Sequence, residues 1–194
     1  MERPDRRDAL VRAAFQCVAE RGFEGLRLRL VAADAGIDHS TLHHYFQTKE
    51  DLVAAVLDHV TRQFWGTMRP DLDPAERLHH HLATLGRMIR EQPELFTVLA
   101  ELDLRARRDP AVRSTIAGDE AGWRAALTSL FQLGADQGAW AEGLDVAAAP
   151  ELVIAVVKGV RLIPDRAESV LAELERSLLG PALGPPPGPR PEGG

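Results

Sequence analysis

The sequence predicts an all-α protein, with a three-helix helix-turn-helix module at the N-terminus and a larger helical bundle after it. Three observations support this. Most segments repeat apolar residues at steps of three and four, as helices with one buried face do. Alternating runs of β-branched residues, which are typical of strands, are scarce. The chain of 194 residues is 45% hydrophobic and 27% charged, which is enough for a packed core in one or two domains.

The first helix is expected over about residues 6–20, where Leu10, Ala14 and Val18 fall on one face. Gly22 follows its expected end, where a residue in the left-handed conformation commonly caps a helix.

Two short helices follow, over about 28–35 and 39–46, and a tight turn joins them. Ala32 is small where two helices must approach closely, and Gly36 can take the positive φ that such a turn requires. Asp38 is expected to cap the second short helix through its carboxylate. The spacing favours a helix-turn-helix, and an ordinary helical hairpin in a bundle is the alternative.

The remainder of the chain continues as helices. A long helix is expected from Lys49, with an apolar stripe that runs as far as Met68. Prolines stand near three later helix starts, where the missing amide costs little. The later helices are expected over about 74–91, 93–107, 110–138, 147–162 and 165–179. Residues from 180 onward are rich in proline and glycine, so they are expected to form a disordered tail.

These elements predict a helix-turn-helix domain over 1–48, a helical domain over 49–180, and the tail over 181–194. The formal net charge is −6, but residues 1–50 carry equal numbers of acidic and basic groups. The later residues therefore hold all of the excess negative charge. An N-terminal module without that excess can approach a phosphate backbone, because local charge placement sets the field.

The segment 35–52, AGIDHSTLHHYFQTKEDL, closely resembles the signature of the TetR family of transcriptional regulators, and the segment 13–23 resembles the upstream part of that signature. The resemblance covers about residues 7–60. It implies an all-helical homodimer that binds a palindromic operator on double-stranded DNA through its N-terminal module. It also implies that residues 49–180 form a ligand-sensing and dimerisation domain, and that a small-molecule effector releases a repressor from DNA. We expect this effector to be largely apolar.

By this resemblance, residues 39–45 form the recognition helix, whose N-terminal residues face base edges in the major groove. Consecutive residues of a helix project about 100° apart, so His43 and His44 cannot face the same base. Two positions depart from the family pattern: Arg27 stands where a Ser or Thr cap is frequent, and His43 where Tyr is commoner. The residues expected at DNA are Arg29, His39, Ser40, Thr41, His43, His44, Tyr45 and Lys49.

Two further sets are expected in the C-terminal part. Aromatic and apolar residues in the middles of the central helices are candidates for an effector pocket, although each could simply be core. The pocket candidates are Trp65, Met68, Met88, Phe96, Leu99, Trp123, Leu127 and Phe131. The wide apolar faces of the last two helices suit a four-helix interface with a second copy, or they cover their own domain. The interface candidates are Val153, Val156, Val157, Val160, Val170, Leu171, Leu174 and Leu178.

Other classes of function have little support. The sequence has no glycine-rich phosphate loop, nucleophile motif or metal-ligand spacing, so an enzyme, a metal site and a cofactor are not expected. The run 79–81 is three histidines, but consecutive helical residues point in three directions. A helical adaptor, or an activator of the same fold without a ligand, remains the alternative. Without a long apolar run or signal pattern, and with Cys17 as the sole cysteine, the protein is expected in the cytoplasm, not at a membrane.

Overall fold

The computed structural model describes residues 3–64 and 66–180, and within these ranges it contains helices and no strand. The predicted all-α class is therefore confirmed. The tail over 181–194 and the pocket candidate Trp65 lie outside the described residues.

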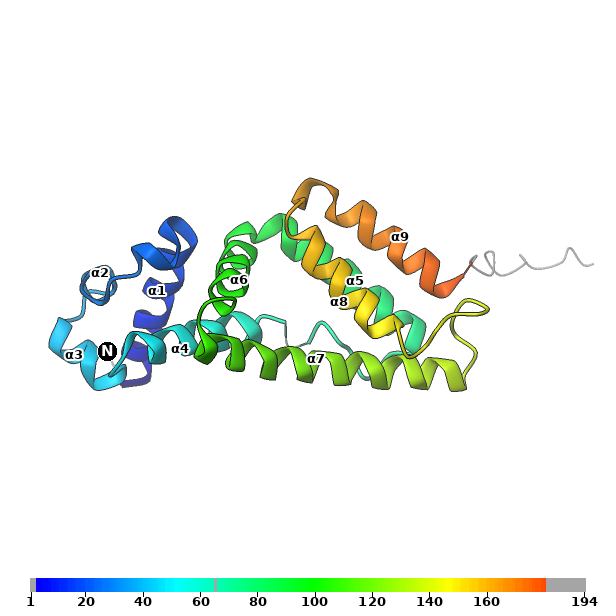
Figure 1. Ribbon diagram of the computed structural model, residues 1–194, viewed down its shortest axis with the longest axis horizontal. Coiled ribbons are helices and arrows are strands. Elements are labelled where there is room, and N and C mark those ends of the chain that lie inside the picture. Colours follow the sequence, from blue (N-terminus) through cyan, green and yellow to red (C-terminus); the bar gives the residue numbers. More distant parts are fainter. Residues whose placement is uncertain (1–2, 65, 181–194) are drawn as a thin grey trace, which may run out of the picture.

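Four helices gather at one end of the molecule, drawn in blue and cyan in Figure 1. They are α1 (Arg3–Gly25), α2 (Leu28–Asp34), α3 (His39–Tyr45) and α4 (Lys49–Arg62). The apolar face expected for the first helix is buried, with Leu10, Ala14 and Val18 each 0% exposed. Gly22 interrupts the helical backbone of α1 with φ 64°, the left-handed conformation predicted for that position.

The α4 helix ends at Arg62, so the prediction that it runs to Met68 is wrong. The helix ends in a tighter turn, in which the amide of Phe64 donates to the carbonyl oxygen of Thr61, three residues earlier, at 3.0 Å. Gly66 then adopts φ 95°, which a residue with a side chain rarely takes. Apolar residues continue past the end of α4 because the loop itself packs against the bundle.

The C-terminal part contains five α-helices within the described residues. They are α5 (Pro74–Glu91), α6 (Pro93–Ala106), α7 (Pro110–Asp136), α8 (Ala149–Val160) and α9 (Ala167–Leu179), with a 3₁₀ turn over Pro164–Arg166. Figure 1 shows α7 running along one side of the bundle, with α5, α8 and α9 over it. Each of α5, α6 and α7 begins at a proline, as predicted.

Helix caps form at some expected positions and not at others. Asp38 precedes α3 but makes no capping hydrogen bond through its side chain, contrary to the prediction. Thr48 caps α4 instead, because its hydroxyl accepts from the amide of Asp51 at 3.0 Å and the Asp51 carboxylate accepts from the amide of Thr48 at 2.9 Å. This reciprocal pair fixes the start of α4, the helix that leads from the module into the bundle.

One continuous cluster of buried apolar side chains extends from α1 to α9. The α4 helix contributes along its whole length, from Leu52 to Val60. The module and the bundle therefore share a core, and α1 packs directly on both α4 and α6.

Candidate nucleic-acid interface and internal cavity

The helix-turn-helix is built by the turn between α2 and α3. Gly36 has φ 64°, and the amide of Ile37 donates to the carbonyl oxygen of Ala32 at 2.9 Å, which closes the turn. Ala32 and Leu42 are 2% and 0% exposed, so both short helices are anchored in the core beside α1. These are the turn residues whose chemistry the sequence predicted.

The α3 helix presents polar side chains to solvent. His39, Ser40, His43 and His44 are exposed, whereas Leu42 is buried. The rings of His39 and His43 lie one helical turn apart, with centroids separated by 4.7 Å, so they share one face. That face also includes Ser40, and it can enter a groove without any rearrangement of the core.

The flanking candidates are less exposed. Thr41 and Tyr45 are half-buried at the sides of α3, and Arg29 is exposed on α2. The ammonium group of Lys49, at the start of α4, donates to the carbonyl oxygen of Phe23 at 3.1 Å. An ammonium group has three donors, so two remain for a phosphate.

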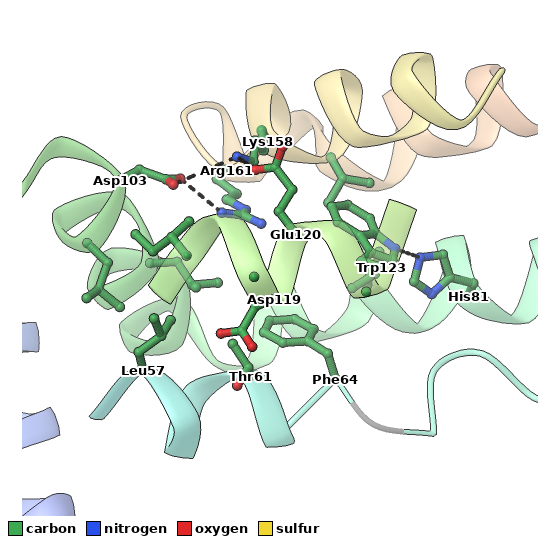
Figure 2. Close-up of a pocket in the computed structure, with 17 residues that line it drawn as sticks. Leu57, Thr61, Phe64, His81, Asp103, Asp119, Glu120, Trp123, Lys158 and Arg161 are labelled. Atoms are coloured by element: carbon green, nitrogen blue, oxygen red, sulfur yellow. Dashed lines mark hydrogen bonds and ion pairs between the residues drawn. The ribbon is translucent and has the colours of Figure 1, made fainter. Parts of the chain in front are cut away.

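A cavity of about 420 Å³ lies in the bundle, in the range typical of small-molecule sites. Its apolar wall comes from α4 to α8: Leu57, Phe64, Leu85, Leu99, Leu102, Ile116, Trp123 and Val157. Its polar wall contains Thr61, His81, Asp103, Asp119, Glu120, Lys158 and Arg161. Figure 2 shows these side chains converging from several helices on one space.

The charged residues of the polar wall form a network. The guanidinium of Arg161 donates to Asp103 at 3.4 Å, and Lys158 pairs with Glu120 and lies 3.9 Å from Asp103. The hydrogen bond from Lys158 lowers the pKa of the Glu120 carboxyl, which stays ionised. Burial lowers the pKa of Arg161, and the nearby carboxylates of Asp103 and Glu120 oppose that effect. This network was missed in the sequence because its members come from three helices, distant in the chain.

His81 is buried at the edge of the cavity, and both of its ring nitrogens are engaged. Trp123 donates from its indole nitrogen to Nε2 of His81 at 3.1 Å. That contact places the ring proton on Nδ1, which lies 3.0 Å from the hydroxyl oxygen of Thr67. The Thr67 hydroxyl in turn donates to the carbonyl oxygen of Phe64 at 2.8 Å. Burial lowers the pKa of His81 to about 4, so the ring is neutral.

These hydrogen bonds give one member of the histidine run 79–81, namely His81, a structural role. His81 faces inward, whereas His79 is exposed and contacts Glu175 at 2.8 Å. Within the described part of the chain, no group of three or more His, Cys, Asp or Glu side chains is placed to hold a metal ion.

The cavity and the DNA-binding module share two helices. The α4 helix lends Leu57 and Thr61 to the cavity, and α6 lends Leu99, Leu102 and Asp103. At the end of α1, Glu101 of α6 accepts a hydrogen bond from the amide of Phe23 at 3.4 Å. The Arg105 guanidinium, also on α6, lies over the Phe23 ring at 5.5 Å. The helices of the cavity wall are therefore in direct contact with the module.

The predicted pocket set coincides only partly with this lining. Leu99 and Trp123 line the cavity. Met68, Met88 and Phe96 pack in or against the core without lining it, and Leu127 and Phe131 are 0% exposed within it. The sequence pattern does not separate these five from the lining residues, because a core side chain and a cavity-lining one occupy the same middle positions of a helix.

Six of the eight predicted interface residues are buried inside the single chain, where α8 and α9 pack on α5 and α7. They are Val153, Val157, Val160, Leu171, Leu174 and Leu178, and only Val156 and Val170 are partly exposed. In the single chain these six are core residues, because the widest apolar face of a helix packs on its own domain first.

A different surface is left uncovered on α8 and the turn after it. Leu152, Leu162 and Ile163 are 46%, 77% and 49% exposed. With the small residues Ala155 and Gly159 and the half-buried Val156, they repeat at helical steps of three and four. We call the set of residues 152, 155, 156, 159, 162 and 163 the outer stripe of α8.

Comparisons with known proteins agree with the geometry of the N-terminal module. Residues 10–56 match the family described as bacterial regulatory proteins, tetR family. The chain is 29% identical over 124 residues to the HTH-type transcriptional repressor NicS of Pseudomonas putida. That alignment covers 60% of this chain and 58% of the relative, so the chain spans little more than half of the relative's length.

Solved structures share the fold at low sequence identity. A TetR transcription regulator from Haloarcula marismortui has a TM-score of 0.81 and 22% identity, over 91% of this chain and 100% of that one. AibR, solved in complex with isovaleryl coenzyme A and operator DNA, has a TM-score of 0.72 and 20% identity, over 91% and 99% of the two chains. No helix within 3–64 and 66–180 is long and apolar enough to cross a membrane.

Proposed function

We propose that this chain, which is a TetR-family transcriptional regulator, is a homodimeric repressor that leaves its operator when a small molecule fills the bundle cavity. The observation that carries the proposal is the sharing of α4 and α6. Each of these helices contributes side chains to the cavity wall and also packs on α1, which in turn packs on α2 of the helix-turn-helix.

The DNA contacts follow from the exposed face of α3. His39, Ser40 and His43 reach base edges in the major groove, because the first turn of a recognition helix lies deepest there. Thr41, His44, Tyr45 and Lys49 lie nearer the backbone, where the free donors of Lys49 meet a phosphate. Arg29 on α2 is exposed and long enough to reach a guanine, for which its planar fork is suited.

The dimer is formed by the outer stripe of α8. Leu152, Leu162 and Ile163 supply exposed apolar area, and Ala155 and Gly159 between them allow close approach of a second helix. A two-fold pairing of this stripe is self-complementary, as an isologous interface requires. Two modules held in this way bind the two halves of a palindromic site.

Release of the operator is explained by the position of α4 in the cavity wall. A ligand beside Leu57 and Thr61 pushes on the second half of α4, whose first half lies in the core of the module. Because packed helices shift as units, the two recognition helices of a dimer then change their separation. The ligand acts only as far as it prefers the shifted state over the DNA-bound one.

The test begins with genome-wide capture of the DNA bound by the chain, followed by fluorescence anisotropy with the recovered site. We expect specific, salt-dependent binding to a palindrome and weaker binding after addition of a cell metabolite extract. Tight operator binding that no extract weakens would favour an activator or a ligand-free regulator. Absence of specific DNA binding, with capture of a protein partner, would favour the adaptor alternative.

A further inference from the structure

We propose that the cavity selects an organic cation with an apolar body, whose ammonium group binds between the Asp119 carboxylate and the Phe64 ring. This inference deepens the proposed function, since it rests on the cavity being the effector site. It depends on three features of the described residues: the charge balance of the polar wall, the surroundings of Asp119, and the position of the end of α4.

Among the charged side chains that line the cavity, one carboxylate has no positively charged partner within the described residues. Of the five charged residues in the lining, Lys158 pairs with Glu120 and Arg161 pairs with Asp103. Asp119 makes no hydrogen bond or ion pair within residues 3–64 and 66–180. The charged lining therefore carries one net negative charge, located at Asp119.

The surroundings of Asp119 disfavour a bare negative charge. Asp119 is exposed to solvent on one side, and the desolvation of its other side raises its pKa, with the carboxylate of Asp58 adding to that effect. Figure 2 shows Asp119 pointing toward Thr61 and Phe64, on the side of the cavity away from the Arg161 and Lys158 ion pairs. A bound cation compensates the charge that no protein group neutralises, and the ring of Phe64 offers it a π face.

The end of α4 adds to the preference for a cation. Thr61 lines the cavity one residue before the end of α4, where the last carbonyl groups of the helix carry partial negative charge. The Thr61 hydroxyl already donates to the carbonyl oxygen of Asp58 at 3.3 Å, so toward the cavity it offers an acceptor. An anion would find no uncompensated positive charge in the lining, because Lys158 is paired with Glu120 and Arg161 with Asp103, and the Trp123 indole already donates to His81.

Arg161 is the one group that argues for an anion. Its Nε has no hydrogen-bond partner, but that atom is buried and does not open onto the cavity. Its Nη1 already donates to Asp103. A ligand carboxylate at Arg161 would compete with Asp103 for its positive charge, whereas an ammonium group meets the unpaired Asp119 directly.

The experiment uses three matched probes with the full chain and isothermal titration calorimetry. Benzyltrimethylammonium carries the cation, neopentylbenzene is its uncharged carbon isostere, and phenylacetate carries a carboxylate. We expect the cation to bind about tenfold or more tighter than the isostere, as an ion pair with a partly solvated carboxylate and a cation–π contact together allow. Phenylacetate is expected to bind weakest of the three.

Asp119→Asn keeps the shape of the side chain and removes its charge. We expect it to remove most of the cation's advantage, to leave neopentylbenzene unchanged, and to leave the melting temperature equal or higher. Asp136→Asn, on the same helix and away from the cavity, is the control and should change none of these values. Cation binding no tighter than the isostere, undetectable cation binding at millimolar concentration, or undiminished cation binding in Asp119→Asn would each overturn the proposal.

Operator anisotropy with the same probe separates this inference from the proposed function. Asp119-dependent cation binding that leaves operator affinity unchanged would support the site and contradict the release mechanism. Preferential binding of phenylacetate, accompanied by operator release, would support the release mechanism and overturn the cation site.

Discussion

The Trp123 indole nitrogen donates to Nε2 of His81 at 3.1 Å, and this bond joins α7 to α5 at the edge of the cavity. Through Nδ1 of the same ring, the connection extends to Thr67 and to the carbonyl oxygen of Phe64 in the loop that follows α4. The end of α4 is thus held by a chain of hydrogen bonds that requires a neutral imidazole.

Acid should weaken the fold through His81. Burial lowers its pKa from 6.5 to about 4, so the unfolded chain binds a proton more readily than the folded one. The stability due to neutral His81 is complete above pH 6.5 and is lost as the pH falls from about 6.5 to about 4. Between pH 7.5 and 5.0 we expect a loss of about 2 kcal/mol from this group alone.

Urea unfolding at these two pH values measures the loss. His81→Gln can still accept from Trp123 and donate to Thr67 but does not titrate, so it should be less acid-sensitive than the parent by that amount. His44→Gln, exposed on α3, is the control and should follow the parent. Equal acid sensitivity of His81→Gln and the parent would show that His81 is not the group responsible.

Lys49→Ala should weaken DNA binding for every sequence alike. The substitution removes one cation from the phosphate face, so the slope of log affinity against log salt should flatten by about one. Because Lys49 also donates to the carbonyl oxygen of Phe23, its melting temperature must be measured beside the affinity. Arg87→Ala, on the exposed face of α5, is the control for loss of a positive charge. A changed sequence preference with an unchanged slope would mean that Lys49 contacts a base.

Substitutions at His39 and His43 should change the sequence preference of DNA binding and not its salt dependence. Their rings share one exposed face of α3, so replacing either with Ala removes a base contact and leaves the phosphate contacts in place. We expect an altered consensus in a randomised-operator selection, with the salt slope unchanged. His44→Ala, about 100° away on the helix, should leave the consensus as it is. A uniform loss of affinity in His39→Ala and His43→Ala would place these rings at the backbone.

The helices and the turn could be predicted from the sequence because their causes are local. Gly22 and Gly36 both adopt the left-handed φ that their positions implied, and three prolines begin helices. The end of α4 could not be predicted from the sequence, because the apolar stripe of the helix continues into a loop whose conformation depends on packing against the bundle. Local sequence chemistry thus determines where the helices and the turn form, whereas packing between distant segments determines where α4 ends.

The cavity was predictable only as a region. Phe131 and Trp123 occupy similar positions in the same helix, yet the first is core and the second borders empty space. The difference depends on how neighbouring helices diverge, which the periodicity of one helix does not contain. Likewise, Asp119 gains its significance from the pairing of Arg161 and Lys158 with other carboxylates, and no sequence spacing shows that.

The last prediction concerns the outer stripe of α8. A Cβ at Gly159 would meet no atom of the described residues within 4 Å apart from the backbone of its own helix, so the position has space in the monomer. Because Gly159 lies in the last turn of α8, the gain in helix propensity from Gly159→Glu is offset by the partial negative charge of the helix end, and the stability of the monomer should change little. In a dimer that pairs this stripe, two buried carboxylates would face each other, and the dimer should dissociate.

Sedimentation equilibrium and operator anisotropy measure the two consequences together. Gly159→Glu is expected to be a monomer that binds one half-site weakly, because the second recognition helix is no longer tethered to the first. Ala83→Glu introduces the same charge on the exposed face of α5 and should stay dimeric, with the parent's operator affinity. A dimer that survives in Gly159→Glu would move the interface away from α8. A dimer lost in both variants would instead point to net charge, because Ala83 lies on a different helix from the stripe.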